Sequence, residues 1–310
     1  MEEVHSLTPK LALHLAAPHT WIASVYPALF GELYCLLKGY PLTGMLALTL
    51  FCACVFMQSA VNTLNDYFDF VKGTDTAADN VEVSDAVLVY EHVNPRQALY
   101  LGFGFLIAAG LLALPAILSQ GAAPLMIGLI GALAVWTYSG GILPISYLPI
   151  GELVSGFVMG GLIPMGLVAA VTGRVEFSVL PFSLPFILSI GLIMMTNNSC
   201  DIEKDRLAKR RTLPALLGRK KARQLYHLAV IVWLALVIFL PLFFMGPRGL
   251  VSLLFLLLVA RHTFVYLLRS PLLPQGRVKQ MQGIVKANLF GNGAYLLALA
   301  VYLIGGGTIG

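Results

Sequence analysis

Apolar runs of about 20 residues follow one another along most of the chain, and each is long enough to cross a membrane as a helix. Only 11% of the residues are charged and the mean hydropathy is +0.83, whereas soluble domains carry roughly twice that charged fraction. The short alternating strands of a lipid-facing barrel are missing from the pattern. The sequence therefore predicts an all-α, polytopic membrane protein. Nine spans are expected, at about 20–37, 43–64, 97–118, 123–141, 151–172, 178–200, 224–244, 249–268 and 286–305.

The distribution of basic residues predicts an orientation. The N-terminus and the loops that follow even-numbered spans hold sixteen Lys and Arg, the opposite loops hold three, and Arg261 lies inside the eighth span. Positive residues collect on the cytoplasmic side, so we expect a multi-pass protein of the cell membrane with a cytoplasmic N-terminus. Attraction to anionic lipid headgroups also accounts for the net charge of +5. Nucleic acid is therefore not an expected partner, and no protein partner is evident.

The chain reads as a single domain, because no linker or low-complexity segment interrupts residues 1–310. The polar motif that ends the second span is weakly similar to the one that ends the sixth. A duplicated unit of four helices, at about 20–141 and 151–268 with a ninth helix appended, would produce that echo.

Two acidic stretches stand at the ends of the second and sixth spans. Helix C-termini carry a partial negative charge, so carboxylates at this position and density need a cationic partner. Oxygen-only ligands with Asn alongside favour Mg²⁺, and two stretches suit two ions shared with the phosphates of a substrate. Both follow even-numbered spans and are expected to open on the cytoplasmic face. Seven of the 15 acidic residues lie here: Asp66, Asp69, Asp75, Asp79, Asp201, Glu203 and Asp205.

Helical spacing predicts which side chains converge on the metal ions. Asn62, Asp66 and Asp69 stand at i, i+4 and i+7, and the second stretch repeats an amide followed by two carboxylates. The predicted catalytic residues are Asp66, Asp69, Asp201 and Asp205. The predicted metal ligands are Asn62, Asp66, Asp69, Asp75, Asn197, Asp201 and Asp205.

A substrate diphosphate would also need direct hydrogen-bond donors beside the metals. We expect Asn65, Lys72, Arg206 and Lys209 to bind it. For Arg210 and Arg211, a role in the site and a role as topology markers are equally open. The basic run 219–223 fits a topology marker better.

A third polar group joins the fourth and fifth spans and contains no Lys or Arg. We predict that Tyr138, Ser139, Tyr147 and Glu152 in this middle loop line a pocket for an aromatic acceptor. The alternative is a Gly/Pro turn with interfacial tyrosines. Glu32, inside the first span, is a site candidate only because intramembrane carboxylates are costly.

These motifs resemble those of the UbiA superfamily of intramembrane prenyltransferases. The run from Asn65 to Asp75 is similar to the branch that prenylates 1,4-dihydroxy-2-naphthoate in menaquinone synthesis, and Asn198-x-x-Asp201-x-x-x-Asp205 is similar to the second motif of the family. The resemblance implies Mg²⁺-dependent transfer of a prenyl group from a prenyl diphosphate, an isoprenoid lipid, to an aromatic quinone precursor. Asp79-Asn80 stands where that branch carries Asp-Arg. Hydroxybenzoate, homogentisate, haem or a porphyrinoid, or a lipid therefore remain open as acceptors.

An ion-coupled secondary transporter is the rival from another class. Transporter carboxylates tend to lie near the bilayer midplane on interrupted helices. Here the carboxylates lie at helix ends beside many Lys and Arg, which favours an enzyme that handles phosphate.

Overall fold

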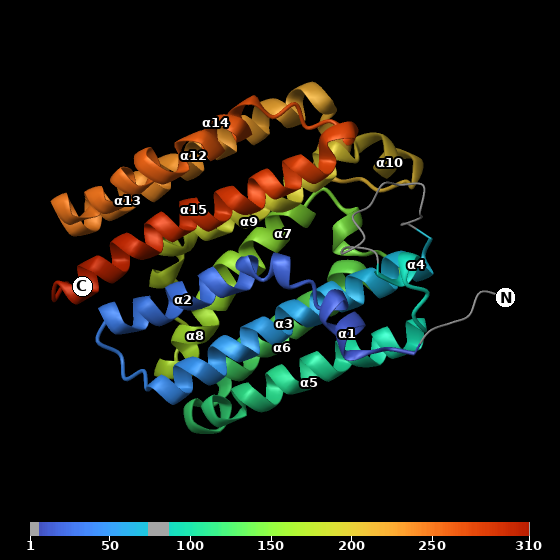
Figure 1. Ribbon diagram of the computed structural model, residues 1–310. Helices are drawn as coiled ribbons and strands as arrows, with labels where there is room; N and C mark the ends of the chain where they lie inside the picture. Colours follow the sequence, from blue (N-terminus) through green and yellow to red (C-terminus); the bar gives the residue numbers. More distant parts are fainter. Residues whose placement is uncertain (1–5, 74–86, 310) are drawn as a thin grey trace.

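The apolar runs form long helices packed side by side in a bundle, as Figure 1 shows for the computed structural model, which describes residues 6–73 and 87–309. The C-terminal ends of α3 and α9 lie at the same end of the bundle, close to α4 and α10; we call it the acidic end. The helices are α1 (Pro9–Leu15), α2 (Ile22–Leu37), α3 (Gly44–Val71), α4 (Val87–Tyr90), α5 (Pro95–Gln120), α6 (Ala122–Ser139), α7 (Gly151–Phe157), α8 (Ile163–Thr172), α9 (Leu180–Cys200), α10 (Ile202–Leu207), α11 (Leu213–Leu217), α12 (Arg219–Met245), α13 (Leu250–Phe255), α14 (Arg261–Arg269) and α15 (Arg277–Ile304).

The structure confirms the all-helical membrane class and modifies the expected spans. Among the described residues, 7 helices are long and apolar enough to cross a membrane, or 8 if the bent pair α1–α2 counts as one span. One of the 7 is the stretch Arg219–Arg269, within which the chain turns at Gly246–Gly249 so that α12 and α14 lie side by side (Figure 1). The count of nine spans and the orientation of the N-terminus stay predictions.

Three helices extend beyond the predicted spans, always at the acidic end. The second span, expected at 43–64, continues as a helix to Val71, while α12 begins at Arg219 and α15 at Arg277. A hydropathy pattern ends where polar side chains begin, but backbone hydrogen bonds continue through polar residues. The extensions carry charged residues past the apolar layer.

The N-terminal segment folds against the bundle rather than leading straight into it. The helical segments Pro9–Thr20 and Ile22–Leu37 meet at an angle of 63°, with Ala17 in the left-handed region at φ 47°. The indole N–H of Trp21 donates to the carbonyl of Ala16 at 2.9 Å and fixes the bend. As a result α1 lies beside α3 and α4 near the acidic end (Figure 1).

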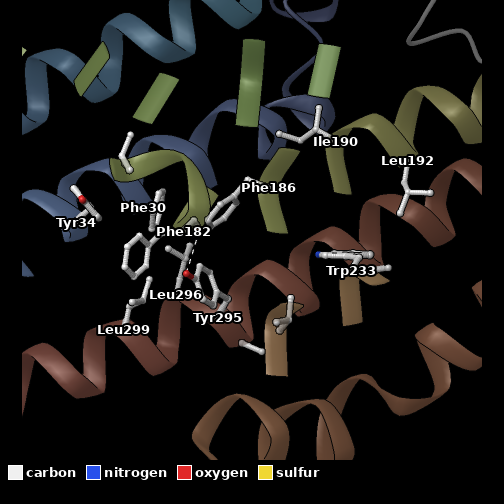
Figure 2. Close-up of a cluster of buried hydrophobic side chains, with 14 of the residues drawn as sticks. Phe30, Tyr34, Phe182, Phe186, Ile190, Leu192, Trp233, Tyr295, Leu296 and Leu299 are labelled. Atoms are coloured by element: carbon white, nitrogen blue, oxygen red, sulfur yellow. Dashed lines mark hydrogen bonds between the residues drawn. The ribbon is translucent and has the colours of Figure 1, made fainter. Parts of the chain in front are cut away.

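A buried aromatic cluster holds α2, α9 and α15 together (Figure 2). The ring centroids of Phe30 and Phe186 lie 5.0 Å apart, and those of Phe186 and Tyr295 lie 5.7 Å apart. The Tyr295 hydroxyl donates to the Phe182 carbonyl at 3.1 Å, so its polar atom is satisfied. Aromatic pairs of this geometry stabilise beyond the area they bury, and this cluster fixes the helices that carry part of the site.

Two glycines allow α7 to pack directly on α9. Gly156 stands on α7, and Gly160 lies four residues further on, in a π-turn that joins α7 to α8. A Cβ atom at Gly160 would lie 2.3 Å from the backbone nitrogen of Ile187, and one at Gly156 would lie 2.4 Å from the Ile187 carbonyl oxygen. Small residues at this spacing let membrane helices approach closely. The contact places the first turn of α7, with Glu152, against α9.

Candidate functional site

The end of α3 and the start of the middle loop form one hydrogen-bonded unit. The Ser139 hydroxyl donates to the side-chain oxygen of Asn65, and the Lys72 ammonium donates to the Ser139 carbonyl at 2.6 Å. Asn65 in turn donates to Asp69 at 3.0 Å. The structure thus brings together four residues that were predicted to share a site.

Tyr147 joins this unit to the segment that follows α10. The Lys72 ammonium lies 5.4 Å from the centroid of the Tyr147 ring, and the guanidinium carbon of Arg210 lies 4.9 Å from it. Cations at this distance from an aromatic face are attracted to it. The backbone N–H of Arg211 also donates to the Tyr147 carbonyl at 2.8 Å. Two cations from distant parts of the sequence therefore converge on one ring.

Arg210 compensates the most deeply buried carboxylate of the second stretch. Asp205 is 1% exposed, its Oδ1 lies 3.5 Å from Arg210 Nε, and Thr212 donates to its Oδ2 at 2.8 Å. Burial raises the pKa of Asp205, while Arg210 and Thr212 act in the opposite direction. Arg210 is therefore half-buried and packed among the polar groups, while its role stays a prediction.

The field of Arg210 reaches both acidic stretches. Burial alone would lower the pKa of Arg210, but Asp205 and Asp69 outweigh burial and raise that pKa. The pKa of Lys72 is lowered, mainly by burial, with Arg210 adding to the effect and Asp69 opposing it. Anionic and cationic side chains from α3 and from the α10 region thus influence one another across a short distance.

The other half of the second stretch is held by a residue that sequence spacing did not indicate. Arg277, the first residue of α15, donates to Asn197 Oδ1 at 2.6 Å and to Asp201 Oδ2 at 3.2 Å. These partners lie 80 and 76 residues earlier in the chain, so no local motif connects them. Arg277 had been counted only as a topology marker.

A buried carboxylate lies at the far end of the middle loop. Glu152 is 4% exposed and its Oε1 accepts a hydrogen bond from Asn198 at 2.8 Å. Its Oε2 is buried and has no hydrogen-bond partner among the described residues. Tyr138 lies nearby, with its side chain hydrogen-bonded to Ser155 and within the field of Glu152. This corner, formed by Glu152 and Tyr138, can therefore accept one more hydrogen bond, at Oε2 of Glu152.

The first acidic helix does not present a single metal-binding stripe. Asn62 donates to the Ala16 carbonyl at 2.9 Å and to the Thr20 hydroxyl at 2.8 Å, so it anchors the N-terminal segment. Asp66 is buried and accepts from the backbone N–H of Val87, the first residue of α4. Positions i, i+4 and i+7 spread over about 40–60° of the helix surface. That arc is wide enough for its members to meet different neighbours.

Of the predicted diphosphate ligands, Arg206 is directed elsewhere and Lys209 is exposed, and one predicted metal ligand is not covered. Arg206 donates through Nε and Nη2 to the Ala215 carbonyl, at 3.0 and 2.7 Å, and so closes the turn between α10 and α11. Lys209 is exposed and has a left-handed backbone, with φ 59°. Asp75 lies outside the described residues.

The donor set fits Mg²⁺ only as part of a shared site. In the described part of the chain, no three His, Cys, Asp or Glu residues lie close enough together to hold a metal ion. The available donors are carboxylate and amide oxygens, the type that Mg²⁺ prefers, and Arg277 and Arg210 currently face those of the second stretch. Six-coordinate Mg²⁺ would need further oxygens, such as those of water or phosphate.

Asn62→Asp separates anchoring from metal binding. An aspartate keeps the oxygen ligands but cannot donate to Ala16 and Thr20, so we expect a loss of about 1–3 kcal/mol in stability and faster proteolysis near the N-terminus. Thermal unfolding in detergent and limited trypsin digestion would measure both. Unchanged stability together with tighter Mg²⁺ binding would restore Asn62 to the metal site.

Known proteins similar to this chain identify its family. The model of the UbiA prenyltransferase family matches residues 24–282. The 1,4-dihydroxy-2-naphthoate octaprenyltransferase of Bacillus subtilis (strain 168) is 34% identical over 208 residues, 67% of this chain and 66% of that protein. UbiA prenyltransferase domain-containing protein 1 of Xenopus tropicalis is 30% identical over 236 residues, 73% of this chain and 65% of that protein. The chain thus matches slightly less than two thirds of the length of each relative.

Solved structures show the same fold. A UbiA homolog from Archaeoglobus fulgidus, bound to GPP and Mg²⁺, superimposes with a TM-score of 0.63 at 15% identity, covering 93% of this chain and 99% of that one. The residues matched by the family model include most of the predicted membrane spans and both acidic stretches. The chain belongs to the UbiA prenyltransferase family.

Proposed function

We propose that this protein transfers a prenyl group from a prenyl diphosphate to 1,4-dihydroxy-2-naphthoate, as a step of menaquinone biosynthesis, at the acidic end of its bundle. The observation that carries the proposal is the convergence of Lys72 and Arg210 on the Tyr147 ring beside Asp205. A diphosphate needs cations that bind its oxygens directly and carboxylates that reach it through a metal. The naphthoate relative and the GPP-bound neighbour support this substrate pair.

Each side chain has a proposed role in binding the diphosphate. Lys72 and Arg210 donate to its oxygens, and Tyr147 keeps the two cations apart at a fixed spacing. Asp69, Asp201 and Asp205 would hold Mg²⁺, and the amide oxygens of Asn65 and Asn197 would be further ligands. Bound Mg²⁺ supplies charge neutralisation of the leaving diphosphate. Asp66 acts indirectly, by fixing the start of α4 through Val87.

The middle loop is the proposed acceptor site. The free Oε2 of Glu152 accepts a hydrogen bond from a ring hydroxyl, and Tyr138 and Ser139 line the same corner. The ring carbon forms a bond to C1 of the prenyl chain as the bond from C1 to the diphosphate oxygen breaks. With naphthoate as acceptor, the ring carboxylate leaves as CO₂. Packing of α7 on α9 excludes water from this region.

Localisation follows from the charge distribution. We propose that the acidic end faces the cytoplasm, because the loops that follow even-numbered spans hold most of the basic residues. Soluble aromatic acids and diphosphate product would then exchange with the cytoplasm, while the prenyl tail stays in the bilayer.

A product screen tests the proposal. Purified protein with Mg²⁺, prenyl diphosphates of several lengths and a panel of aromatic acceptors would be analysed by mass spectrometry, with EDTA as the control. We expect a naphthoate product whose mass equals acceptor plus prenyl group minus CO₂ and one hydrogen atom. If a product formed only with hydroxybenzoate, homogentisate, a porphyrinoid or a lipid, that compound would replace naphthoate as the proposed acceptor. No product with any acceptor would contradict prenyl transfer.

Lys72→Ala and Lys221→Ala separate a substrate ligand from a surface cation. Both side chains are exposed, but Lys72 contacts Ser139, Phe68 and Tyr147, whereas Lys221 stands on the first turn of α12. We expect Lys72→Ala to raise the KM for prenyl diphosphate about tenfold, because a direct charge-assisted contact is lost. Lys221→Ala should change it less than twofold. Equal effects in steady-state kinetics would contradict the assignment of Lys72.

A further inference from the structure

The last third of the chain carries positive charge with no negative charge of its own. Residues 206–310 contain fourteen Lys and Arg and no Asp or Glu. The three nearest preceding carboxylates, Asp205, Glu203 and Asp201, are paired with Arg210, Arg219 and Arg277, respectively. The remaining basic residues of α14 and α15 therefore have no carboxylate partner within this part of the sequence.

Three of these residues border one seam between neighbouring antiparallel helices. α14 and α15 pack side by side, with the Tyr266 ring against Gly283, where an added Cβ would lie 2.4 Å from a ring carbon. The rings of Phe255 and Phe290, 6.4 Å apart, extend the contact in antiparallel register. Because Gly283 has no side chain, the ring of Tyr266 packs directly against α15 at this point and forms the bottom of the seam.

The register places the cations along the two rims. Arg269 lies three residues after Tyr266, and Lys279 four residues before Gly283, so both are about one turn nearer the acidic end. Lys286 lies three residues after Gly283, about one turn deeper. All three side chains are exposed, and none has an ion-pair partner among the described residues. We call Arg269, Lys279 and Lys286 the seam cations.

Lys286 stands at the start of the predicted ninth span, at 286–305, where the helix enters the apolar layer. It lies nine residues from the start of α15, or about 13 Å along the helix. Its neighbours on the same surface include exposed Leu289 and Val265, which are suited to lipid. The ammonium packs near the Phe290 ring, 5.8 Å from its centroid, and has no anion. A lysine at this boundary can extend its ammonium toward the phosphates of the headgroup layer.

We propose that the seam between α14 and α15 binds the phosphate headgroup of one anionic phospholipid from the leaflet at the acidic end. Three cations on two helices can surround one phosphate, with the acyl chains lying along the apolar parts of α14 and α15. A zwitterionic headgroup would bring its own ammonium next to three cations, so a headgroup with a net negative charge fits better. The proposal does not depend on the reaction that the protein catalyses.

The proposal is tested by lipid titration of the full-length protein in neutral detergent, followed by native mass spectrometry. We expect one phosphatidylglycerol to bind at least tenfold more tightly than phosphatidylcholine. The triple variant Arg269→Gln/Lys279→Gln/Lys286→Gln should lose at least tenfold in this affinity. The matched control, Lys220→Gln/Lys221→Gln/Arg223→Gln, removes three exposed cations at the start of α12 and should lose less than twofold. Equal losses in the two triple variants, or no preference in the unmodified protein, would overturn the proposal.

Two competition arms identify the source of the phosphate. Millimolar inorganic phosphate that displaces the lipid one for one would indicate a site for free phosphate and overturn the lipid assignment. Displacement by geranyl diphosphate would indicate a substrate site with the same consequence. The single variant Lys286→Gln repeats the titration if the triple variant does not fold, with an expected loss of at least threefold.

Discussion

Replacing Asp205 by Asn is expected to reduce prenyl transfer at least a hundredfold while the protein stays folded in detergent. The side chain is buried beside Arg210 and Thr212, and Asn keeps its shape and its ability to accept from Thr212. The change removes one anionic ligand from the proposed Mg²⁺ site. Loss of such a ligand costs about 3 kcal/mol or more of transition-state stabilisation. Asp69→Asn and Asp201→Asn should act in the same direction.

Glu203→Gln is the matched control, because it removes one negative charge from the same stretch. Glu203 is exposed and pairs with Arg219 rather than with Arg210 or Arg277. We expect this variant to retain most of its activity at saturating Mg²⁺. Turnover of a radiolabelled prenyl diphosphate would be compared in all four variants. Near-normal turnover in both Asp205→Asn and Asp201→Asn would exclude a metal site built on the second stretch.

Gly160→Ala should destabilise the protein by about 3 kcal/mol, which in many membrane proteins is enough to prevent recovery of folded material. The new methyl group would lie 2.3 Å from the Ile187 nitrogen and 2.5 Å from the Ile187 Cα and the Phe186 carbonyl carbon. Backbone atoms cannot rotate aside as a flexible side chain can, so α7 and α9 must separate. Thermal unfolding of purified protein and the yield of monodisperse material would measure the loss.

Gly128→Ala serves as the control for helix packing. Gly128 lies on α6 with nothing within 4 Å of an added Cβ, and alanine has the better intrinsic helix propensity. We expect this variant to be as stable as the unmodified protein or slightly more stable. Equal losses at both positions would mean that helix packing at Gly160 is looser than its contacts indicate.

The sequence predicted the membrane fold well because hydropathy reports directly on the solvent that surrounds each helix. It was less informative about helix ends. The continuation of α3 to Val71 depends on polar side chains that bind neighbouring segments, and hydropathy carries no signal for those contacts. The division into a single domain of residues 1–310 and the duplication of residues 20–141 in 151–268 stay predictions.

Local spacing found the residues of the site that lie within one or two turns of each other. Asn65 and Lys72 were expected near Asp69 on that basis, and Asn65 donates to Asp69. Spacing could not distinguish two roles for Arg210. A cation near the end of a membrane helix has the same sequence pattern whether it marks topology or faces a substrate. Spacing could not find Arg277 at all, because the contact with Asp201 bridges 76 residues.

The long reach of Arg277 has a consequence for how the protein is made. A ribosome releases Asn197 and Asp201 well before the first residue of α15, so for a time during synthesis these two side chains lack the guanidinium of Arg277. Insertion of the last helix supplies the missing counter-charge and fixes the geometry of both oxygens. The contacts around Asn197 and Asp201 are therefore complete only after α15 has joined the bundle.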